Sequence, residues 1–534
     1  MNRAEVKRRQ AGEISNILTL VTVGVIGNLT GENGITYIAV AVELYALIWA
    51  VAGGGLTDTL GRLLRGRRNK GQYKNAEKLR KSALVFQAAV GLAGSLFLLI
   101  FAQVIAGKAF GIRYSGLIIM VLSPIVLLRS VSSVLLGYFQ GAGTELPGMA
   151  SGILRQILIL GLGLLFTGLW GNYGEKVSRL LQQDNFTPMH KGIGAVFAMV
   201  LAELLIVIAL ALLYYVGTRR ERNGRQEGLY STDSFLDCAR YLGGGRWPQA
   251  LVGVLKCLPF ILGLALLGKT ASNEDGMALD YGVFAGKYLV ICGIVVCIIS
   301  MAMLPVAARI YASLRREDNR FARSVFQSGM HICMVHGIFA ASFLAFMGSW
   351  FAELFCGEEG ETMRKMLQGG SCVVPFLALA AFFSLFLRSS GKKYPLLAAV
   401  GIADIVFAAT VALTQGIGRV GVLSLVYGGI TGSFVLCILL GALSGRQMRL
   451  QVDWLNVLIM PSGAAAAAGL LCMLLGKLIS PHLGSLVTLI VTLILSLAIY
   501  WVALLIMRNF REQELEVMTG GRLIHMLGQI LQVY

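Results

Sequence analysis

The stretch of residues 192–217, GIGAVFAMVLAELLIVIALALLYYVG, decides the fold class of this chain, and Glu203 is its only charged residue. A membrane-spanning helix needs roughly 20 mostly apolar residues, and this stretch is longer. The whole chain of 534 residues is 56% hydrophobic and only 14% charged, whereas an ordinary soluble domain is about 25% charged. About fourteen spans of ~21 residues would place ~55% of the chain in lipid. The composition therefore predicts a polytopic membrane protein.

Charge runs and Gly/Pro clusters divide the chain into about fourteen predicted transmembrane helices. They cover residues 13–30, 35–57, 82–106, 116–137, 149–170, 192–217, 248–268, 281–307, 327–352, 369–388, 395–414, 420–441, 455–477 and 483–507. These segments are too long for barrel strands, so the predicted fold class is all-α. The first segment follows a basic start, as a signal peptide does, but its polar residues and the lack of a small-residue cleavage site favour a retained helix.

The distribution of Lys and Arg predicts the orientation of these helices. With a cytosolic N-terminus, 32 of the 46 Lys and Arg fall in cytosolic segments, 10 fall in outer loops and four lie within spans. By the positive-inside rule, both termini are expected in the cytosol.

The positive-inside rule alone accounts for the many basic residues in the predicted cytosolic segments. The net charge of +18 and the run 62–81 would otherwise suggest RNA binding, but topology requires basic residues there and no nucleic-acid partner is expected. Contact with anionic membrane lipids is expected instead. The end of the cytosolic tail could form an interfacial helix. Its apolar face would consist of Leu523, Met526, Leu527, Ile530 and Leu531.

Weak internal matches indicate a duplicated unit. Leu-Val-Phe-Gln at 84–87 returns as Ser-Val-Phe-Gln at 324–327, and four later matches follow in order at nearly constant offset. Parallel repeats of this kind form two lobes related by a pseudo-twofold axis along the membrane normal. The predicted organisation is an N-terminal six-helix lobe (1–217), a cytosolic linker (218–247), a C-terminal six-helix lobe (248–441), two extra helices (455–507) and a cytosolic amphipathic tail (508–534).

The repeat places Arg155 and Asp404 at equivalent positions of opposite charge in the two lobes. If the lobes face each other across a cavity, these side chains could meet there. Alternatively, backbone groups or water neutralise each of them separately. A contact between Arg155 and Asp404 is therefore one of two predictions for these residues.

Ionisable residues in mid-span are costly and usually face a cavity or a partner. The candidate cavity cations are Arg129, Arg155, Lys256 and Lys287, and the candidate coupling or charge-balancing carboxylates are Glu43, Glu203 and Asp404. Four cations against three carboxylates leave a mildly positive interior, which suits a phosphate or pyrophosphate. Arg129 could instead snorkel toward the inner end of its helix in a structural role.

Motifs for catalysis, metal binding or nucleotide binding are not found in the sequence. Gly-Gly-Gly occurs at 53–55 and 243–245, but neither copy continues into the Lys-Ser/Thr of a P-loop. The nine cysteines form no CxxC, and no His or carboxylate has metal-ligand spacing. We therefore expect no catalytic residue, no metal and no cofactor, and a transporter without an ATP site.

The stretch Gly-Tyr-Phe-Gln-Gly at 137–141, followed by Pro147, Ser151 and Gln156, resembles a signature of polysaccharide-type flippases. These proteins belong to the multidrug/oligosaccharidyl-lipid/polysaccharide (MOP) exporter superfamily, and the resemblance is closest to its stage V sporulation and lipid II flippase (MurJ-like) group. Further similar stretches lie at 34–37, 304–309 and 387–395.

The resemblance implies two six-helix lobes that alternate between inward-open and outward-open states in the bacterial cytoplasmic membrane. A central cationic cavity would hold the headgroup of an undecaprenyl-pyrophosphate-linked saccharide, and residues 455–507 would form a groove for its lipid tail. It also implies a coupling cation (H⁺ or Na⁺) and cell-wall synthesis proteins as partners. Lys287 and Glu43 lie in helices where lipid II flippases carry a cavity arginine and an acid.

Two departures leave lipid II itself open as the substrate, since the first helix has no arginine and Arg155 stands where related proteins have Glu. Two other functions stay open beside the flippase. One is a multidrug/cation antiporter of the same superfamily, for which twelve helices and buried carboxylates without competing cations would suffice. The other is a non-transporting membrane scaffold or enzyme of cell-wall synthesis.

Overall fold

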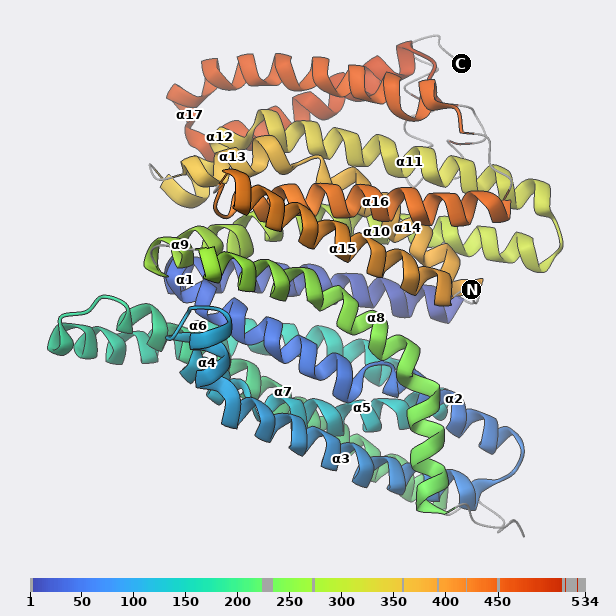
Figure 1. The fold of residues 1–534 in the computed structure, drawn as a ribbon. Coiled ribbons are helices and arrows are strands. Elements are labelled where there is room, and N and C mark those ends of the chain that lie inside the picture. Colours follow the sequence, from blue (N-terminus) through green and yellow to red (C-terminus); the bar gives the residue numbers. More distant parts are fainter. Residues whose placement is uncertain are drawn as a thin grey trace. The chain divides into compact units, whose positions relative to one another are not determined.

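The computed structural model describes residues 3–222, 234–270, 274–357, 360–390, 393–418, 420–448, 452–510, 514 and 526. These residues form helices joined by turns, and none of them lies in a β-strand (Figure 1). The all-α fold expected from the composition is therefore confirmed.

Within the described ranges, twelve helices are long and apolar enough to cross a membrane. Two further helices, Glu361–Gly370 and Val373–Arg388, are bent by 52° relative to each other and together would form a thirteenth span. The first of these segments, Glu5–Asn69, contains a break at Gly31 and holds two of the predicted spans. Each of the fourteen predicted segments is thus found in helical structure, although several helices are longer than predicted. The predicted span 149–170, for example, lies inside a helix that runs from Leu146 to Leu181.

Two glycines separate helices that would otherwise run on continuously. Gly31 divides α1 (Arg3–Gly53) and has φ 76°, and Gly484 divides α17 (Met460–Ile506) and has φ 70°. Only glycine adopts this left-handed region without a steric cost from Cβ. The turns between spans one and two and between spans thirteen and fourteen therefore each depend on one residue.

Contacts divide the chain into two compact units. The N-terminal unit comprises residues 21–282, and the C-terminal unit comprises residues 1–20 and 283–534. Besides the second part of α1, the N-terminal unit contains α2 (Leu56–Asn69), α3 (Tyr73–Val104), a π-helical turn (Ile105–Ala109), α4 (Ser115–Leu122), α5 (Ile125–Gly141), α6 (Leu146–Leu181), α7 (Phe186–Arg222), α8 (Phe235–Thr270) and most of α9 (Glu274–Val283).

The core of the N-terminal unit lies where α2, α3, α5 and α7 meet. Leu56, Leu60 and Leu64 lie on one face of α2, four residues apart, and are at most 1% exposed. They pack against Val134 and Tyr138 of α5. Burial of one such leucine stabilises a fold by about 2 kcal/mol. The apolar face of α2 therefore holds this helix against α5.

The C-terminal unit is also entirely helical in its described residues. It contains the start of α1, a π-helical turn (Phe284–Tyr288), α10 (Leu289–Arg315), α11 (Asn319–Phe346), α12 (Gly348–Cys356), α13 (Glu361–Gly370), α14 (Val373–Ser389), α15 (Lys393–Gly418), α16 (Leu423–Met448), a second π-helical turn (Leu455–Ile459) and α17. The two helices of α17, which correspond to the predicted extra pair, pack on α11 and α12. Tyr500 of α17 donates a hydrogen bond of 2.8 Å to the carbonyl of Val335.

The contact-based units differ from the predicted lobe boundaries. α8 belongs to the N-terminal unit, and the first twenty residues belong to the C-terminal unit. The predicted linker 218–247 is partly helical, because α7 ends at Arg222 and α8 begins at Phe235. Compact units are defined by packing and the lobes by an internal repeat, so the lobe division stays a prediction. The predicted tail helix lies outside the described residues, apart from Met526.

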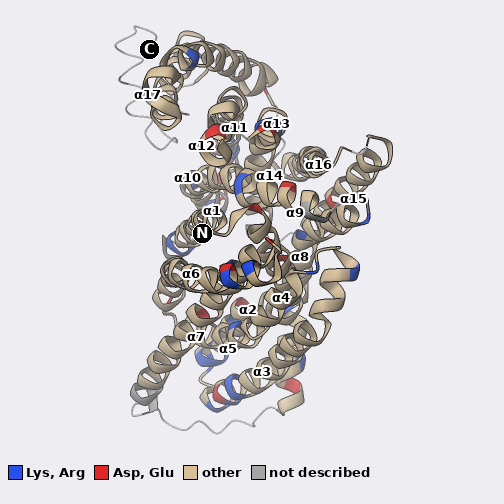
Figure 2. Cartoon of the chain, turned by 90° about the vertical axis from the view of Figure 1, so that its left-hand side faces the viewer, with Lys and Arg blue, Asp and Glu red and all other residues tan. Residues whose placement is uncertain are grey.

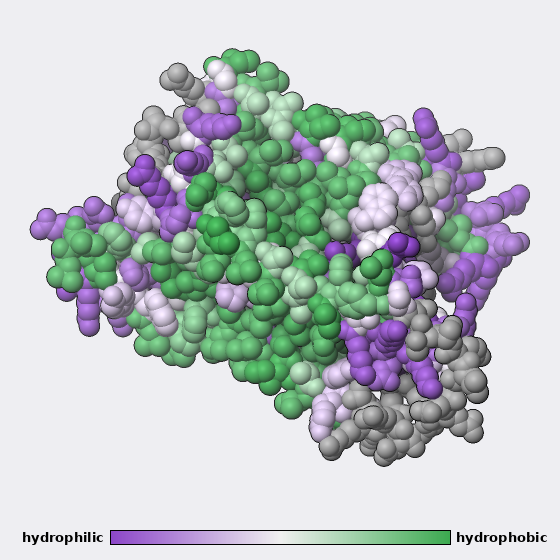
Figure 3. Space-filling view, turned by 60° about the horizontal axis from the view of Figure 1, so that its bottom comes forward, coloured by the Kyte–Doolittle hydropathy of each residue, from purple (hydrophilic) through white to green (hydrophobic). Residues whose placement is uncertain are grey.

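The distribution of side chains fits a membrane protein. Charged residues are few along the helices (Figure 2), and on the face in Figure 3 apolar side chains fill the middle while hydrophilic ones lie toward two opposite ends. α3 exposes large apolar side chains such as Leu92, Ile100 and Val104. A soluble protein seldom exposes so many apolar side chains together, and lipid accounts for them.

Candidate functional site

Three of the seven predicted site residues come together inside the N-terminal unit. Arg129 lies on α5, Arg155 on α6 and Glu203 on α7. Glu203 is 1% exposed, whereas the side chains of Arg155 and Arg129 are 11% and 28% exposed. The carboxylate thus lies deepest, and the two guanidinium groups lie between it and the more accessible space.

The Glu203 carboxylate accepts hydrogen bonds at both oxygens. Oε2 accepts one of 2.6 Å from Arg155 Nε and one of 2.8 Å from Arg129 Nη1. Oε1 accepts one of 2.8 Å from the Ser132 hydroxyl and a longer one of 3.4 Å from Arg155 Nη2. Charge-assisted bonds of this kind are about twice as strong as neutral ones. We call these four residues the Glu203 cluster.

The Glu203 cluster carries more positive than negative charge. Two guanidinium groups face one carboxylate, and arginine stays protonated in proteins. Within the described part of the chain, Arg129 uses one of its five N–H groups and Arg155 uses two. The remaining donors and the surplus charge make the cluster suited to a second anion.

Two neighbours of this cluster were not among the predicted site residues. Ser132 bonds directly to Glu203, and Tyr45 of α1 lies within electrostatic range of Arg129 and Glu203. Ser132 belongs to a group of three serines at 130, 132 and 133, next to Arg129 in a mostly apolar helix. These serines were the sequence feature that could have predicted Ser132 as a site residue, because polar side chains in a membrane span usually face a partner.

Glu43 forms a second, separate site in the same unit. The hydroxyl of Tyr281, on α9, donates a hydrogen bond to Glu43 Oε1. The other oxygen, Oε2, is buried and has no hydrogen-bond partner among the described residues. Nearby, the Thr36 hydroxyl donates to the carbonyl of Ala278, so α9 is held to α1 at two points.

The remaining predicted site residues lie elsewhere. Lys256 is exposed on α8 and makes none of the hydrogen bonds to Glu203. Lys287 lies in a π-helical turn of the C-terminal unit, where its ammonium donates to Cys356 Sγ at 3.3 Å. Asp404 is half-buried on α15, and its Oδ2 has no hydrogen-bond partner in the described ranges.

The predicted contact between Arg155 and Asp404 would join the two units and stays a prediction. Within its own unit, Arg155 is paired with Glu203. Alignment of the two repeats could not reveal that Glu203 is the partner of Arg155. It matches equivalent positions in the two lobes, and it gives no information about which helices are neighbours within one lobe.

The Gly-Tyr-Phe-Gln-Gly stretch at 137–141 has a packing role in the structure. A Cβ atom at Gly141 would come within 2.7 Å of Leu64, and one at Gly137 within 3.0 Å of Leu60. Gln140 donates a hydrogen bond of 3.1 Å to Asp58 Oδ1. The two glycines thus permit the close approach of α2 to α5.

Comparison with known proteins supports the resemblance given by these motifs. No family model matches the chain. A curated relative, stage V sporulation protein B of Bacillus subtilis (strain 168), is 22% identical over 96% of this chain and 97% of its own length. A solved structure of the lipid II flippase MurJ, in an inward closed conformation, superposes on this chain with a TM-score of 0.64. The two are 11% identical, and the match covers 94% of this chain and 98% of that one.

A multidrug resistance transporter of the MATE family of the MOP superfamily, in an inward-facing conformation, gives a TM-score of 0.62. It is 13% identical and covers 84% of this chain and 98% of its own. The chain has the fold of the MOP superfamily of transporters. The resemblance seen in residues 137–156 is confirmed at the level of the fold, and the described helices that are long and apolar enough to cross a membrane make the chain a multi-pass membrane protein.

Proposed function

We propose that this protein is a flippase that moves an undecaprenyl-pyrophosphate-linked saccharide across the bacterial cytoplasmic membrane by alternating access. The saccharide unit would be a peptidoglycan precursor or another cell-envelope polysaccharide unit. The observation that carries the proposal is the Glu203 cluster, with two arginines for one carboxylate.

The chemistry of the cluster fits a diphosphate group. Guanidinium presents a planar fork of N–H donors that matches phosphate oxygens two at a time. Arg129 is the more exposed of the two arginines and keeps most of its donors available within the described residues. It is therefore the residue proposed to contact the pyrophosphate, while Arg155 holds Glu203 in place. Lys256 and Lys287 are proposed as further cavity cations and Asp404 as a charge-balancing carboxylate, because ionisable residues in mid-span usually face a cavity or a partner.

The helices beyond the two six-helix lobes support a lipid-linked substrate. The chain continues after α16 into the two long apolar helices of α17, and large side chains such as Leu474, Ile490 and Ile494 are exposed along them. A groove for a polyprenyl tail needs such a surface, whereas a drug antiporter with twelve helices does not. The lipid II flippase structure also covers more of the chain than the multidrug transporter does.

The proposal is tested with purified full-length protein in proteoliposomes. The probe is a fluorescent undecaprenyl-pyrophosphate-linked disaccharide, and translocation is measured by its protection from a reagent that destroys the label only in the outer leaflet. Arg129→Gln keeps a polar side chain but removes the charge and the fork of N–H donors of the guanidinium group. We expect translocation to fall by at least about tenfold, the effect of losing one charge-assisted contact.

Lys176→Gln is the matched control. Lys176 is exposed on α6, and its substitution changes the net charge of the protein by the same amount. It is expected to translocate like the unchanged protein. If Arg129→Gln and Lys176→Gln have equal rates, the cluster does not bind the diphosphate. If the unchanged protein moves no probe at all, the flippase function is wrong, and a scaffold role becomes the better explanation.

Coupling to H⁺ or Na⁺ is assigned to Glu43, whose second oxygen lacks a hydrogen-bond partner in the described residues. The orientation proposed from the distribution of Lys and Arg places both termini in the cytosol, and cell-wall synthesis proteins are proposed as partners. Single cysteines reacted with a membrane-impermeant reagent would test the orientation.

The alternative function is export of cationic drugs, and Glu43 is the observation that favours it. A buried carboxylate bonded to a neutral tyrosine attracts a cation, whereas the two arginines at Glu203 repel one. Efflux of a cationic dye from vesicles separates the two functions. Dye efflux that Glu43→Gln abolishes and Arg129→Gln leaves unchanged would support the antiporter over the flippase.

A further inference from the structure

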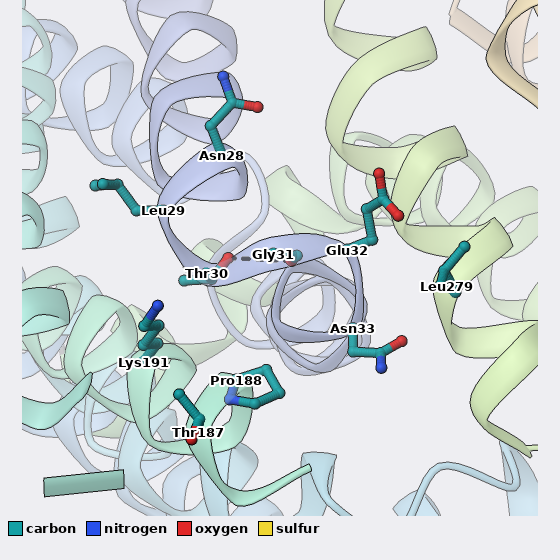
Figure 4. Close-up of a pocket in the computed structure, with 10 residues that line it drawn as sticks. All are labelled: Asn28, Leu29, Thr30, Gly31, Glu32, Asn33, Thr187, Pro188, Lys191 and Leu279. Atoms are coloured by element: carbon teal, nitrogen blue, oxygen red, sulfur yellow. Dashed lines mark hydrogen bonds between the residues drawn. The ribbon is translucent and has the colours of Figure 1, made fainter. Parts of the chain in front are cut away.

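A pocket of about 350 Å³ lies in the N-terminal unit, away from the Glu203 cluster. Three segments that are far apart in the sequence line it: the turn at the break in α1, the start of α7, and α9 (Figure 4). Its volume falls at the small end of the ~300–1,000 Å³ that is typical of small-molecule sites. The lining residues used below are Asn28, Glu32, Asn33, Thr187, Lys191 and Leu279.

The walls of this pocket are held by close backbone packing. A Cβ atom at Gly34 would lie 3.1 Å from the carbonyl oxygen of Pro188, and one at Gly282 would collide with the backbone of Glu32. These glycines bring α7 and α9 directly against the turn after Gly31. By contrast, an added Cβ at Gly31 would meet no heavy atom within 4 Å. The turn is therefore fixed on its two flanks and open at its apex.

Two polar groups in the pocket, the amide oxygen of Asn33 and the ammonium of Lys191, lack partners within the described residues. Asn33 Oδ1 is buried and accepts no hydrogen bond there. The aliphatic stem of Lys191 packs on Gly171 of α6, since a Cβ there would be 3.0 Å from Lys191 Cγ. No hydrogen bond or ion pair joins the Lys191 ammonium to any described residue. Leaving the buried oxygen of Asn33 unpaired costs free energy, which a ligand that donates a hydrogen bond would recover.

The start of α7 is not a phosphate site, although it is a helix N-terminus. The Thr187 N–H donates to Ser178 Oγ at 3.0 Å, Pro188 has no N–H, and the Met189 N–H donates to the Asn185 carbonyl at 3.3 Å. A phosphate would need these backbone donors free. The carboxylate of Glu32 also lines the pocket and offsets the charge of Lys191.

These observations together indicate a ligand without net charge that carries several hydroxyl or amide groups. We propose that the pocket is a second subsite for the saccharide, separate from the diphosphate site at Arg129. This inference rests on the proposed function, and it names the sugar moiety as the part of the substrate that the turn after Gly31 recognises. The ammonium of Lys191 and the amides of Asn28 and Asn33 supply donors, and Asn33 Oδ1 and Glu32 supply acceptors.

The test uses full-length protein in lipid nanodiscs and saturation-transfer NMR with N-acetylglucosamine as the probe. Inorganic pyrophosphate serves as the competing anion, and nanodiscs without protein give the background. Lys191→Met removes the ammonium but keeps the stem that packs on Gly171. The double variant Lys191→Met/Asn33→Leu should bind the sugar about tenfold more weakly, because two hydrogen bonds to the sugar are lost. Lys176→Met, on the exposed face of α6, is expected to bind like the unchanged protein.

A second variant removes space instead of polar groups. Leu279 is 39% exposed and lines the pocket from α9, so Leu279→Trp reduces the space in the cavity without replacing any of its hydrogen-bonding side chains. It is expected to abolish sugar binding with unchanged thermal unfolding. Because no buried side chain is altered, it keeps the test valid if the double variant fails to fold.

Three outcomes would overturn the saccharide subsite. They are a lack of sugar binding to the unchanged protein, sugar binding that survives in Leu279→Trp, and displacement of the sugar by pyrophosphate in a Lys191-dependent manner. The translocation assay separates this inference from the proposed function. Translocation without sugar binding at the pocket would reject the subsite alone, whereas Lys191-dependent sugar binding without translocation would reject the flippase alone.

Discussion

Two buried carboxylates of the N-terminal unit differ in how completely their charge is balanced. Both oxygens of Glu203 accept hydrogen bonds, from two arginines and a serine. Glu43 accepts one hydrogen bond from the neutral Tyr281, and its other oxygen has no hydrogen-bond partner among the described residues. A buried charge is tolerated when it is paired and is costly when it is not.

The contrast separates a structural carboxylate from one that can respond to its surroundings. Glu203 is the counter-ion that allows two like charges to lie side by side, so its own charge cannot change without disrupting them. Glu43 has no cationic hydrogen-bond partner among the described residues and can therefore gain or lose a proton or a bound cation at lower cost. The predictions below test whether this difference holds.

The largest effect is expected from Glu203→Gln. The amide keeps the size of the side chain but leaves the guanidinium groups of Arg129 and Arg155 facing each other without a counter-ion. Removing one partner of a buried ion pair typically costs about 3–5 kcal/mol, and we expect a loss of that size. Unfolding in mixed micelles titrated with SDS measures it.

Glu175→Gln is the control for this substitution, because Glu175 is exposed on α6 and the change in charge is the same. We expect it to unfold within about 0.5 kcal/mol of the unchanged protein. Equal stability of the two variants would show that Glu203 is not the counter-ion that holds the arginines together.

A smaller effect is expected from Arg155→Leu, because Arg129 then still balances Glu203 in a one-to-one pair. We expect a loss of about 1–3 kcal/mol. In the double variant Glu203→Gln/Arg155→Leu, the repulsion between guanidinium groups is gone, so part of the stability lost in Glu203→Gln should return. The double-mutant cycle measures the coupling between the two residues. Losses that simply add would contradict a shared cluster.

Tyr281→Phe tests the other carboxylate and should cost about 1–2 kcal/mol, because the phenol hydroxyl is the hydrogen-bond donor to Glu43. It also removes one of the two links between α9 and α1. Tyr173→Phe is the control, since Tyr173 is 60% exposed. If both variants unfold alike, the bond between Tyr281 and Glu43 does not contribute to stability.

The membrane spans could be predicted from the sequence because their length and apolar character are local properties. Stretches such as 192–217 need no knowledge of their neighbours to be recognised as helices. The breaks lie close to predicted boundaries, because the first predicted span ends at residue 30, next to Gly31, and the fourteenth begins at residue 483, next to Gly484. The longer ends of α6 and α7 were not predicted, since their many polar residues are more typical of loops than of membrane spans.

The partners of the buried charges were only partly predictable. Arg129 and Glu203 were both selected because charges in a span are costly, yet 74 residues separate them. Which helices are neighbours, and how each is rotated, depends on packing that no local pattern records. For the same reason Tyr281, in the predicted eighth helix, was not recognised as the partner of Glu43, and the place of Lys256 among the cavity cations stays a prediction.

The smallest effect is expected from Ser132→Ala, which removes one hydrogen bond of 2.8 Å to Glu203. Both arginines remain, so the carboxylate keeps its counter-charge, and we expect a loss of about 1 kcal/mol. Ser133→Ala is a closely matched control, because both hydroxyls lie within hydrogen-bond distance of a backbone carbonyl of α5, but only that of Ser132 also reaches Glu203. A bond to the backbone of the same helix contributes little to stability, and a change below about 0.5 kcal/mol is expected.

The difference between these two serine variants decides what balances Glu203. If Ser132→Ala costs more than Ser133→Ala, the neutral hydroxyl adds to the stabilisation by the arginines, and complete hydrogen bonding distinguishes Glu203 from Glu43. If the two variants unfold alike, the arginines alone hold Glu203. The two carboxylates then differ only in the charge of their partners, and a cation introduced beside Glu43 would be enough to make them equivalent.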